Sequence, residues 1–361
     1  MLKINSAQSV SLDLVRLLAA QLVLIGHSLS FLNISEDMSY IQNIGVVLFF
    51  ILSGLIISYT VFYKSQYYYT FRLFLIERFA RIYTGLVPSL LFIAVADFAV
   101  QHYNVEAYQY SNAYNIKTFI GNLFMLQDYQ DIGHYLKWII PESLHITSFG
   151  SGRPLWTLSI EWWLYMSFGL IYFFYAKSFS WKYILVLIFV SIEPVWNLLY
   201  GPSRAHGLTI FWLFGMLATL LVFRPQALSR SLALVLSIMF LFFSIIIVVY
   251  TQDAYSVRFA FFMASFLFFM LLYQQKNLKV YNGAFSKTIK FLAGYSFTLY
   301  LVHYTILDII IALHLSFDKY ILAIFSFFIV NFIAMGIAVF TEMKHKVFAK
   351  KLKTIVGISH A

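Results

Sequence analysis

Apolar stretches of about 20 residues recur along this chain, separated by short polar turns, from near its start to about residue 342. A helix needs roughly 20 apolar residues to cross the hydrocarbon core of a bilayer, and it satisfies its own backbone hydrogen bonds there. The composition agrees, because 61% of the residues are hydrophobic and only 11% are charged. The sequence therefore predicts an all-α polytopic membrane protein.

These stretches predict ten transmembrane helices. Basic residues gather in alternate connections and in the tail, so the positive-inside rule predicts that both termini are cytoplasmic. The net charge of +10 is then explained by topology and by attraction to anionic lipids, without nucleic-acid binding. We expect a single domain over 1–361, with a helical core at about 10–342 and a basic cytoplasmic tail at 343–361. The predicted helices lie at about residues 10–32, 43–63, 73–99, 154–176, 182–199, 207–223, 232–250, 257–273, 291–314 and 319–342.

One predicted outer segment, at about residues 100–153, is much longer than the other connections. Long connections with structure of their own tend to be functional. Within it, residues 115–126 have apolar positions at helical spacing, which predicts a helix lying at the membrane interface or dipping into the bundle. A surface segment with no role in chemistry is the alternative.

The first predicted helix contains Arg16 and His27 in the run RLLAAQLVLIGH. A charged side chain in a spanning helix costs roughly 2.5–3.5 kcal/mol on insertion scales. Eleven residues at 100° each bring the two side chains to one face, about 16 Å apart along the axis. Taken alone, His27 fits helix packing as well as catalysis, and Arg16 fits an inner-boundary anchor as well as a binding site.

The second and third predicted helices carry two further patterns. Ser53 and Gly54 lie mid-membrane, where small residues usually permit close helix packing, with a backbone opening for a ligand as the alternative. Arg78 and Arg81 share a helical face. They are either ordinary boundary charge or a phosphate pocket, since guanidinium groups bind phosphates in a bidentate manner.

Polar residues also enter the fourth and ninth predicted helices. Glu161 lies at a depth comparable to His27, and a buried carboxylate needs a partner. Trp156 and other aromatic residues surround it, as they would in an interfacial belt. Later, Ser296, Tyr300 and His303 form a polar stripe on one helical face.

Together these pieces resemble the acyltransferase-3 family of integral-membrane acyltransferases. The resemblance rests on Arg16 and His27, FFILSG at Phe49–Gly54, Arg78 and Arg81, WTLSIE at Trp156–Glu161, and Ser296, Tyr300 and His303. It covers about residues 10–342. The family often has a second acid directly after the position of Glu161, and this chain has Trp162 there, which argues against a mechanism needing two adjacent carboxylates.

The resemblance implies transfer of an acyl group, most often acetyl, from cytoplasmic acyl-CoA to a hydroxyl of an extracytoplasmic glycan or glycolipid. Arg16, Arg78 and Arg81 are then expected to bind the donor phosphates. We expect no tightly bound cofactor, and a thioester is already activated, so no metal is required. The chain has no cysteine, which excludes a thiol acyl-enzyme and a zinc–thiolate site. Membrane lipids are expected partners, and the expected location is a bacterial inner membrane.

In the expected mechanism, His27 is general base on the acceptor hydroxyl, or carries the acyl group briefly, while Glu161 orients it. Tyr300, Ser159 or a backbone N–H near Gly54 would stabilise the oxyanion. The competing function is a transporter or flippase of a lipid-linked glycan, because buried ionisable residues line transport pathways as readily as active sites.

Overall fold

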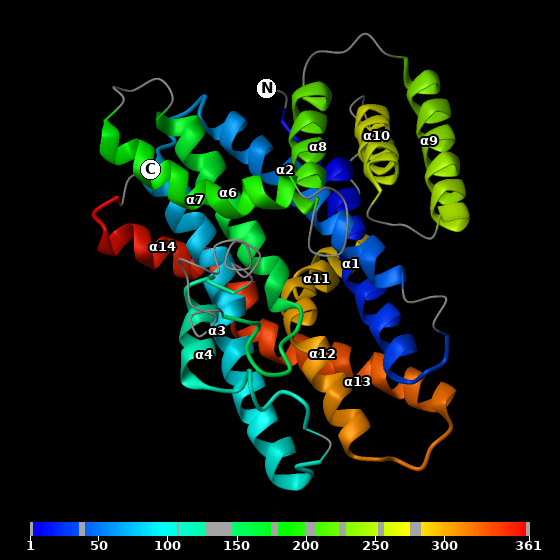
Figure 1. Cartoon of the computed structure of the whole chain (residues 1–361). Helices are drawn as coiled ribbons and strands as arrows, with labels where there is room; N and C mark the ends of the chain where they lie inside the picture. The colour runs from blue at the N-terminus through cyan, green and yellow to red at the C-terminus, as the bar shows by residue number, and fades with distance from the viewer. Residues whose placement is uncertain are drawn as a thin grey trace. The chain divides into compact units, whose positions relative to one another are not determined.

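The computed structural model describes residues 3–35, 40–106, 108–127, 146–174, 180–199, 207–223, 229–251, 256–274 and 283–358, and every element in these ranges is helical. Figure 1 shows their arrangement. In chain order the helices are α1 (Ser6–Phe31), α2 (Ile41–Lys64), α3 (Phe71–Tyr103), α4 (Ile116–Leu123), α6 (Leu155–Phe174), α7 (Trp181–Leu199), α8 (Leu208–Val222), α9 (Arg230–Thr251), α10 (Val257–Tyr273), α11 (Ala284–Ala293), α12 (Ser296–Ala312), α13 (Lys319–Phe340), the 3₁₀ helix η2 (Glu342–Lys344) and α14 (His345–Ile355).

Helix formation is confirmed in all ten predicted ranges, and the predicted helix in the outer segment is present as α4. The middle of that segment, residues 128–145, lies outside the described residues. The prediction of a single helix at 291–314 is wrong, because the chain breaks between α11 and α12 at Gly294 and Tyr295. The Ser296 hydroxyl donates to the carbonyl oxygen of Ala293, which supplies a hydrogen bond that the break removes.

Within the described residues, five helices are long and apolar enough to cross a membrane, or six if the broken pair α11 and α12 counts as one span. The chain is therefore a multi-pass membrane protein, while the count of ten spans and the orientation stay predictions. The described parts of α8 and α10 are not counted as spans, because they have 15 and 17 residues and a perpendicular span needs about 20. The five qualifying segments are Ser6–Phe31, Ile41–Lys64, Phe71–Tyr103, Trp181–Leu199 and Lys319–Ile355.

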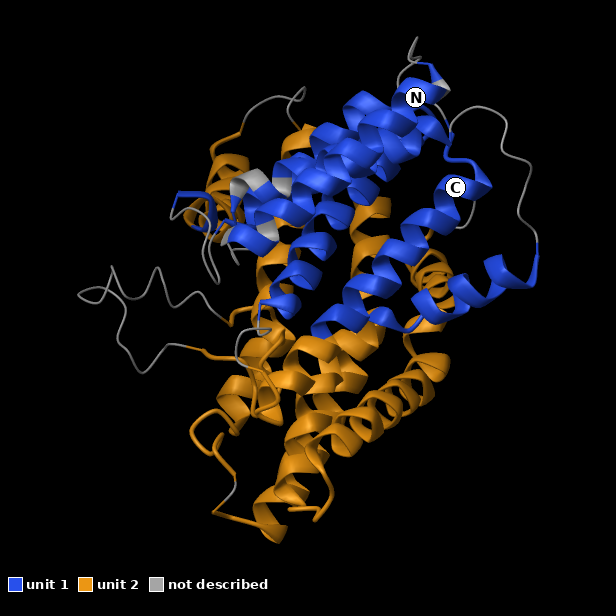
Figure 2. Cartoon of the chain, turned by 90° about the vertical axis from the view of Figure 1, so that its right-hand side faces the viewer, with its two compact units in different colours: residues 1–23, 40–70, 197–296 blue, residues 24–39, 71–196, 297–361 orange. Residues whose placement is uncertain are grey.

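The chain forms two compact units, coloured separately in Figure 2. Unit 1 contains residues 1–23, 40–70 and 197–296, and in it α2 packs against α8 and α10, while α9 packs against α10. Unit 2 contains residues 24–39, 71–196 and 297–361, and in it α3 packs against α4, α6, η2 and α14. The unit 2 part of α1 carries His27.

Unit 1 depends on a close helix crossing that only glycine allows. A Cβ atom on Gly54 of α2 would lie 1.9 Å from the carbonyl oxygen of Trp212 in α8. A Cβ atom on Gly215 of α8 would lie 2.0 Å from the carbonyl oxygen of Ile51 in α2. The packing interpretation of Gly54 is therefore confirmed, since the two backbones approach each other directly.

Candidate functional site

His27 lies among aromatic side chains of α12. Its ring centroid is 5.1 Å from that of His303 and 5.3 Å from that of Tyr304, which it meets edge-on. Tyr304 also packs edge-on against Phe31, one helical turn beyond His27 on α1. His27 is half-buried, so its ring sits in a largely apolar setting with one face toward a second imidazole.

His303 is fully buried, and its hydrogen bonds identify its tautomer. Its Nδ1 lies 2.8 Å from the carbonyl oxygen of Tyr300 and 3.2 Å from that of Leu299. A carbonyl oxygen can only accept, so Nδ1 carries the proton and, in the neutral ring, Nε2 presents a lone pair. That Nε2 makes no hydrogen bond within the described part of the chain. A buried imidazole nitrogen without a partner, beside His27, can accept one hydrogen bond from a reacting group.

The hydroxyl protons of Tyr300 and Ser159 are both engaged. Thr157 donates to the carbonyl oxygen of Pro154, so the Tyr300 hydroxyl donates to Thr157 Oγ1 at 2.8 Å. Ser159 Oγ donates to the carbonyl oxygen of Met125 at 2.9 Å. Either group would have to exchange its present acceptor before it could stabilise an oxyanion.

Met125 turns that carbonyl toward α6 by adopting a left-handed backbone conformation. Its φ of +58° is uncommon for a residue other than glycine. The same oxygen also accepts a hydrogen bond from the Trp163 indole at 2.7 Å. Ser159 thus helps to join the connection between α3 and α6 to α6 itself.

Glu161 and Trp156 lie on α6, and both are half-buried. The Glu161 carboxylate accepts a short hydrogen bond from the Tyr165 hydroxyl, one turn further along the same helix. His303 and Tyr304 are among the side chains that contact the His27 ring. The role of Glu161 in orienting His27 stays a prediction.

The two arginines of α3 have different surroundings. Arg81 forms an ion pair of 2.8 Å with Glu342, whose second oxygen accepts hydrogen bonds from the backbone N–H and the hydroxyl of Thr298. Glu342 is fully buried, so this pair joins α3, α12 and η2. Arg78 has a buried Nε with no hydrogen-bond partner among the described residues. A guanidinium group with an unsatisfied buried N–H is suited to binding an anion, as the phosphate-pocket interpretation requires.

Arg16 and Ser53 belong to unit 1. Arg16 is half-buried and forms an ion pair of 3.2 Å with Asp13, three residues earlier on α1. α1 is continuous from Ser6 to Phe31, so Arg16 and His27 do lie on one helix, as their spacing predicts. Ser53 is half-buried on α2, next to the glycine crossing.

Sequence reasoning missed two buried acids, Asp97 in α3 and Glu342 in η2. Asp97 interrupts an apolar run, so the criterion that selected Arg16 would have selected it too. Glu342 stands at the end of an apolar run, just before the basic residues of the tail, and gives no such signal. Asp97 is 1% exposed and accepts hydrogen bonds from the backbone N–H of Ser151 at 2.8 Å, from the Ser151 hydroxyl at 2.5 Å and from the Tyr108 hydroxyl at 3.0 Å. Its hydrogen bonds hold the connection between α3 and α6 against α3. The described residues include no group of three or more His, Cys, Asp or Glu side chains that could hold a metal ion.

Comparison with known proteins identifies the family. A family model described as "Acyltransferase domain", that of the acyltransferase-3 family, matches residues 9–341, nearly the whole chain. The matched range includes every residue that the sequence proposed for the site, and it ends one residue before Glu342. No curated protein and no solved structure matches the chain. The chain therefore belongs to the acyltransferase-3 family of membrane acyltransferases.

Proposed function

We propose that the protein is an O-acyltransferase that moves an acyl group, most often acetyl, from acyl-CoA to a hydroxyl of an extracytoplasmic glycan or glycolipid. The observation that carries this proposal is the His27–His303 pair, in which a buried imidazole nitrogen lacks a partner. An acyl transfer from a thioester needs a base for the acceptor hydroxyl and an environment that excludes water. The proposed cellular site is a bacterial inner membrane.

In the proposed reaction, His27 removes the proton from the acceptor hydroxyl as the oxygen attacks the thioester carbonyl. The tetrahedral intermediate then collapses, the carbon–sulfur bond breaks, and the imidazolium returns the proton to the CoA thiolate. In the covalent variant, His27 first accepts the acyl group and then passes it to the hydroxyl. His303 positions the His27 ring, and Tyr300 becomes the oxyanion donor by turning away from Thr157.

The donor phosphates are proposed to bind Arg78 first, because its buried Nε is unsatisfied. They are also proposed to bind Arg81, through the guanidinium N–H groups that its ion pair with Glu342 does not use. Arg16 is also proposed to bind the donor, and this role is based on the sequence pattern alone. Glu161 is proposed to act on the acceptor side, since its carboxylate is held by Tyr165 on α6.

The test uses membranes containing the protein, incubated with acetyl-CoA labelled in the acetyl group, with the label then counted in the glycan fraction. In parallel, purified protein is assayed for CoA release with a thiol-reactive dye. The chain has no cysteine, so every new thiol comes from CoA. We expect His27→Ala to lower transfer by about 10²–10⁴-fold, the usual contribution of a general base.

The matched control is His102→Ala, which removes an exposed histidine from the far end of α3 and should leave transfer unchanged. Near-normal transfer by His27→Ala would refute the assignment of the base. Movement of unmodified glycan with no incorporated label would favour a transporter instead.

A further inference from the structure

Unit 2 contains a groove of about 470 Å³ between α3 and the segment formed by the end of α13, η2 and α14. We call it the α3–α14 groove. Its volume falls within the roughly 300–1,000 Å³ typical of small-molecule pockets. It is lined by Phe79, Tyr83, Thr84, Val87, Pro88, Phe340, Thr341, Lys344, Val347, Phe348 and Lys351.

The groove is separate from the candidate donor site. At 100° per residue, Phe79, Tyr83 and Val87 project roughly opposite to Arg78 and Arg81 on α3. Neither arginine lines the groove, and neither do His27 and its neighbours on α12. Thr84 and Pro88, which also line the groove, lie on the Arg81 side of α3, one and two turns further along the helix. A ligand bound here would therefore contact α3 beside and beyond the two arginines rather than the arginines themselves.

The charge of the groove is uncompensated. Lys344 and Lys351 are its only charged lining residues, both are exposed, and neither side chain forms an ion pair or hydrogen bond with another described residue. Lys353, on the same helix, does have a carboxylate partner, because it pairs with Glu77 of α3 at 2.9 Å. The two lysines of the groove thus leave positive charge available to an anion.

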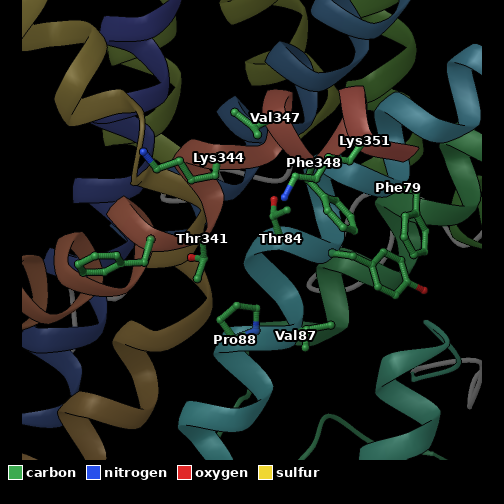
Figure 3. A pocket seen from close by; sticks show the side chains of 11 residues that line it. Phe79, Thr84, Val87, Pro88, Thr341, Lys344, Val347, Phe348 and Lys351 are labelled. Atoms are coloured by element: carbon green, nitrogen blue, oxygen red, sulfur yellow. The ribbon is translucent and has the colours of Figure 1, made fainter. Parts of the chain in front are cut away.

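The groove has a positively charged part at Lys344 and Lys351 and an apolar part at Val87 and Pro88. Figure 3 shows Lys344 and Lys351 on the red ribbon of η2 and α14, and Val87 and Pro88 on the cyan ribbon of α3. α13 alone has 22 residues, or about 33 Å of helix, which already spans the hydrocarbon core. α14 therefore begins near the membrane boundary, where its exposed Val347 and Ile355 suit an interfacial helix. With α14 at this boundary, the lysines would lie at headgroup depth and the apolar floor would extend toward the hydrocarbon.

We propose that the α3–α14 groove binds an anionic phospholipid, with its phosphate on Lys344 and Lys351 and an acyl chain along Val87 and Pro88. The ammonium groups bind the phosphate and the apolar floor accepts the chain. The hydroxyl groups of Thr84 and Thr341 donate to the carbonyl oxygens of Ala80 and Ile337, so the lysines alone supply donors to the phosphate. A zwitterionic lipid would bind less well, because its own cationic group opposes the two lysines.

The experiment measures lipid binding to the purified, delipidated full chain by native mass spectrometry, with dioleoyl phosphatidylglycerol or dioleoyl phosphatidylcholine as the probe. We expect the double variant K344Q/K351Q to weaken phosphatidylglycerol binding by about tenfold or more. The matched control is K346Q/K350Q, which removes the same charge from exposed positions of α14 that do not line the groove. Val87→Trp, which fills the floor and keeps the charge, should also weaken binding.

Equal effects of the two double variants would overturn the proposal, as would equal binding of the two lipids by the wild type. Displacement of phosphatidylglycerol by free CoA would also overturn it and would make the groove a donor-phosphate site. Size-exclusion elution identifies any variant that has lost its fold, and Val87→Trp then serves as the deciding variant. Binding is measured without donor or acceptor, so the result does not depend on the proposed acyl transfer.

Discussion

At the scale of single residues, Asp97 shows how one buried carboxylate shapes the connection between α3 and α6. Ser151 supplies two of its hydrogen bonds, and the Ser151 hydroxyl also lies 2.8 Å from that of Thr305 on α12. The neighbouring Gly150 has a φ of +52°, and a Cβ atom there would lie 1.9 Å from the Asp97 carboxylate. Glycine is therefore required at position 150 for two reasons, its backbone conformation and the space it leaves.

The same carboxylate affects Tyr108, which lies in the connection after α3. Burial, and then the negative charge of Asp97, raise the pKa of Tyr108 above its ordinary value of 10.0. The folded state thus holds this proton more tightly than the unfolded state does. Its contribution to the free energy of unfolding is complete below about pH 10 and declines as the pH rises further.

We therefore expect the thermal unfolding midpoint of the detergent-solubilised protein to fall between about pH 9 and pH 11, and to fall less steeply in Tyr108→Phe. Tyr68→Phe, at a position 94% exposed, should keep the slope of the wild type. Identical slopes in all three proteins would show that Tyr108 makes no such contribution.

Sequence patterns identified His27, Arg78 and Arg81 as candidates, because charge and imidazole in apolar helices stand out one residue at a time. They could not identify Tyr304, since an aromatic residue in a membrane helix is ordinary. Its importance comes from contact with His27 across 277 positions of the chain. Nor could spacing along one helix show that Arg81 is paired with Glu342.

At the scale of helices, the close crossing of α2 and α8 leads to a specific prediction about Gly54. We expect Gly54→Ala to lower the free energy of unfolding by about 1–3 kcal/mol, because the added methyl group would meet a backbone carbonyl of α8 that cannot rotate away. Gly336→Ala in α13 is the matched control, since no described atom outside the adjoining backbone of its own helix lies within 4 Å of its added Cβ. That change should be neutral or stabilising, because alanine favours helix by up to about 1 kcal/mol over glycine.

Thermal unfolding followed by circular dichroism in detergent measures both variants. Equal unfolding midpoints for Gly54→Ala and Gly336→Ala would mean that the crossing tolerates a methyl group and that the two helices can separate at little cost.

At the scale of the whole molecule, the predicted orientation can be tested directly because the chain has no cysteine. Asn112, between α3 and α4, and Lys346, on α14, are both exposed. The charge distribution predicts that they lie on opposite sides of the membrane. We expect a membrane-impermeant maleimide to label Asn112→Cys in intact cells and Lys346→Cys only after permeabilisation. Labelling of both variants in intact cells would contradict this orientation, and so would the reverse pattern.

The sequence by itself determined that the chain is helical and membrane-embedded and that it carries the residues of an acyltransferase. Hydrophobic periodicity and charge in apolar runs are local properties, so they can be read without a partner helix. Only the tertiary structure decided that His303 and Tyr304 flank His27, that Glu342 holds Arg81, and that α14 closes a groove on α3. Such contacts depend on helix rotation and packing between segments distant in sequence, which no single stretch of residues encodes.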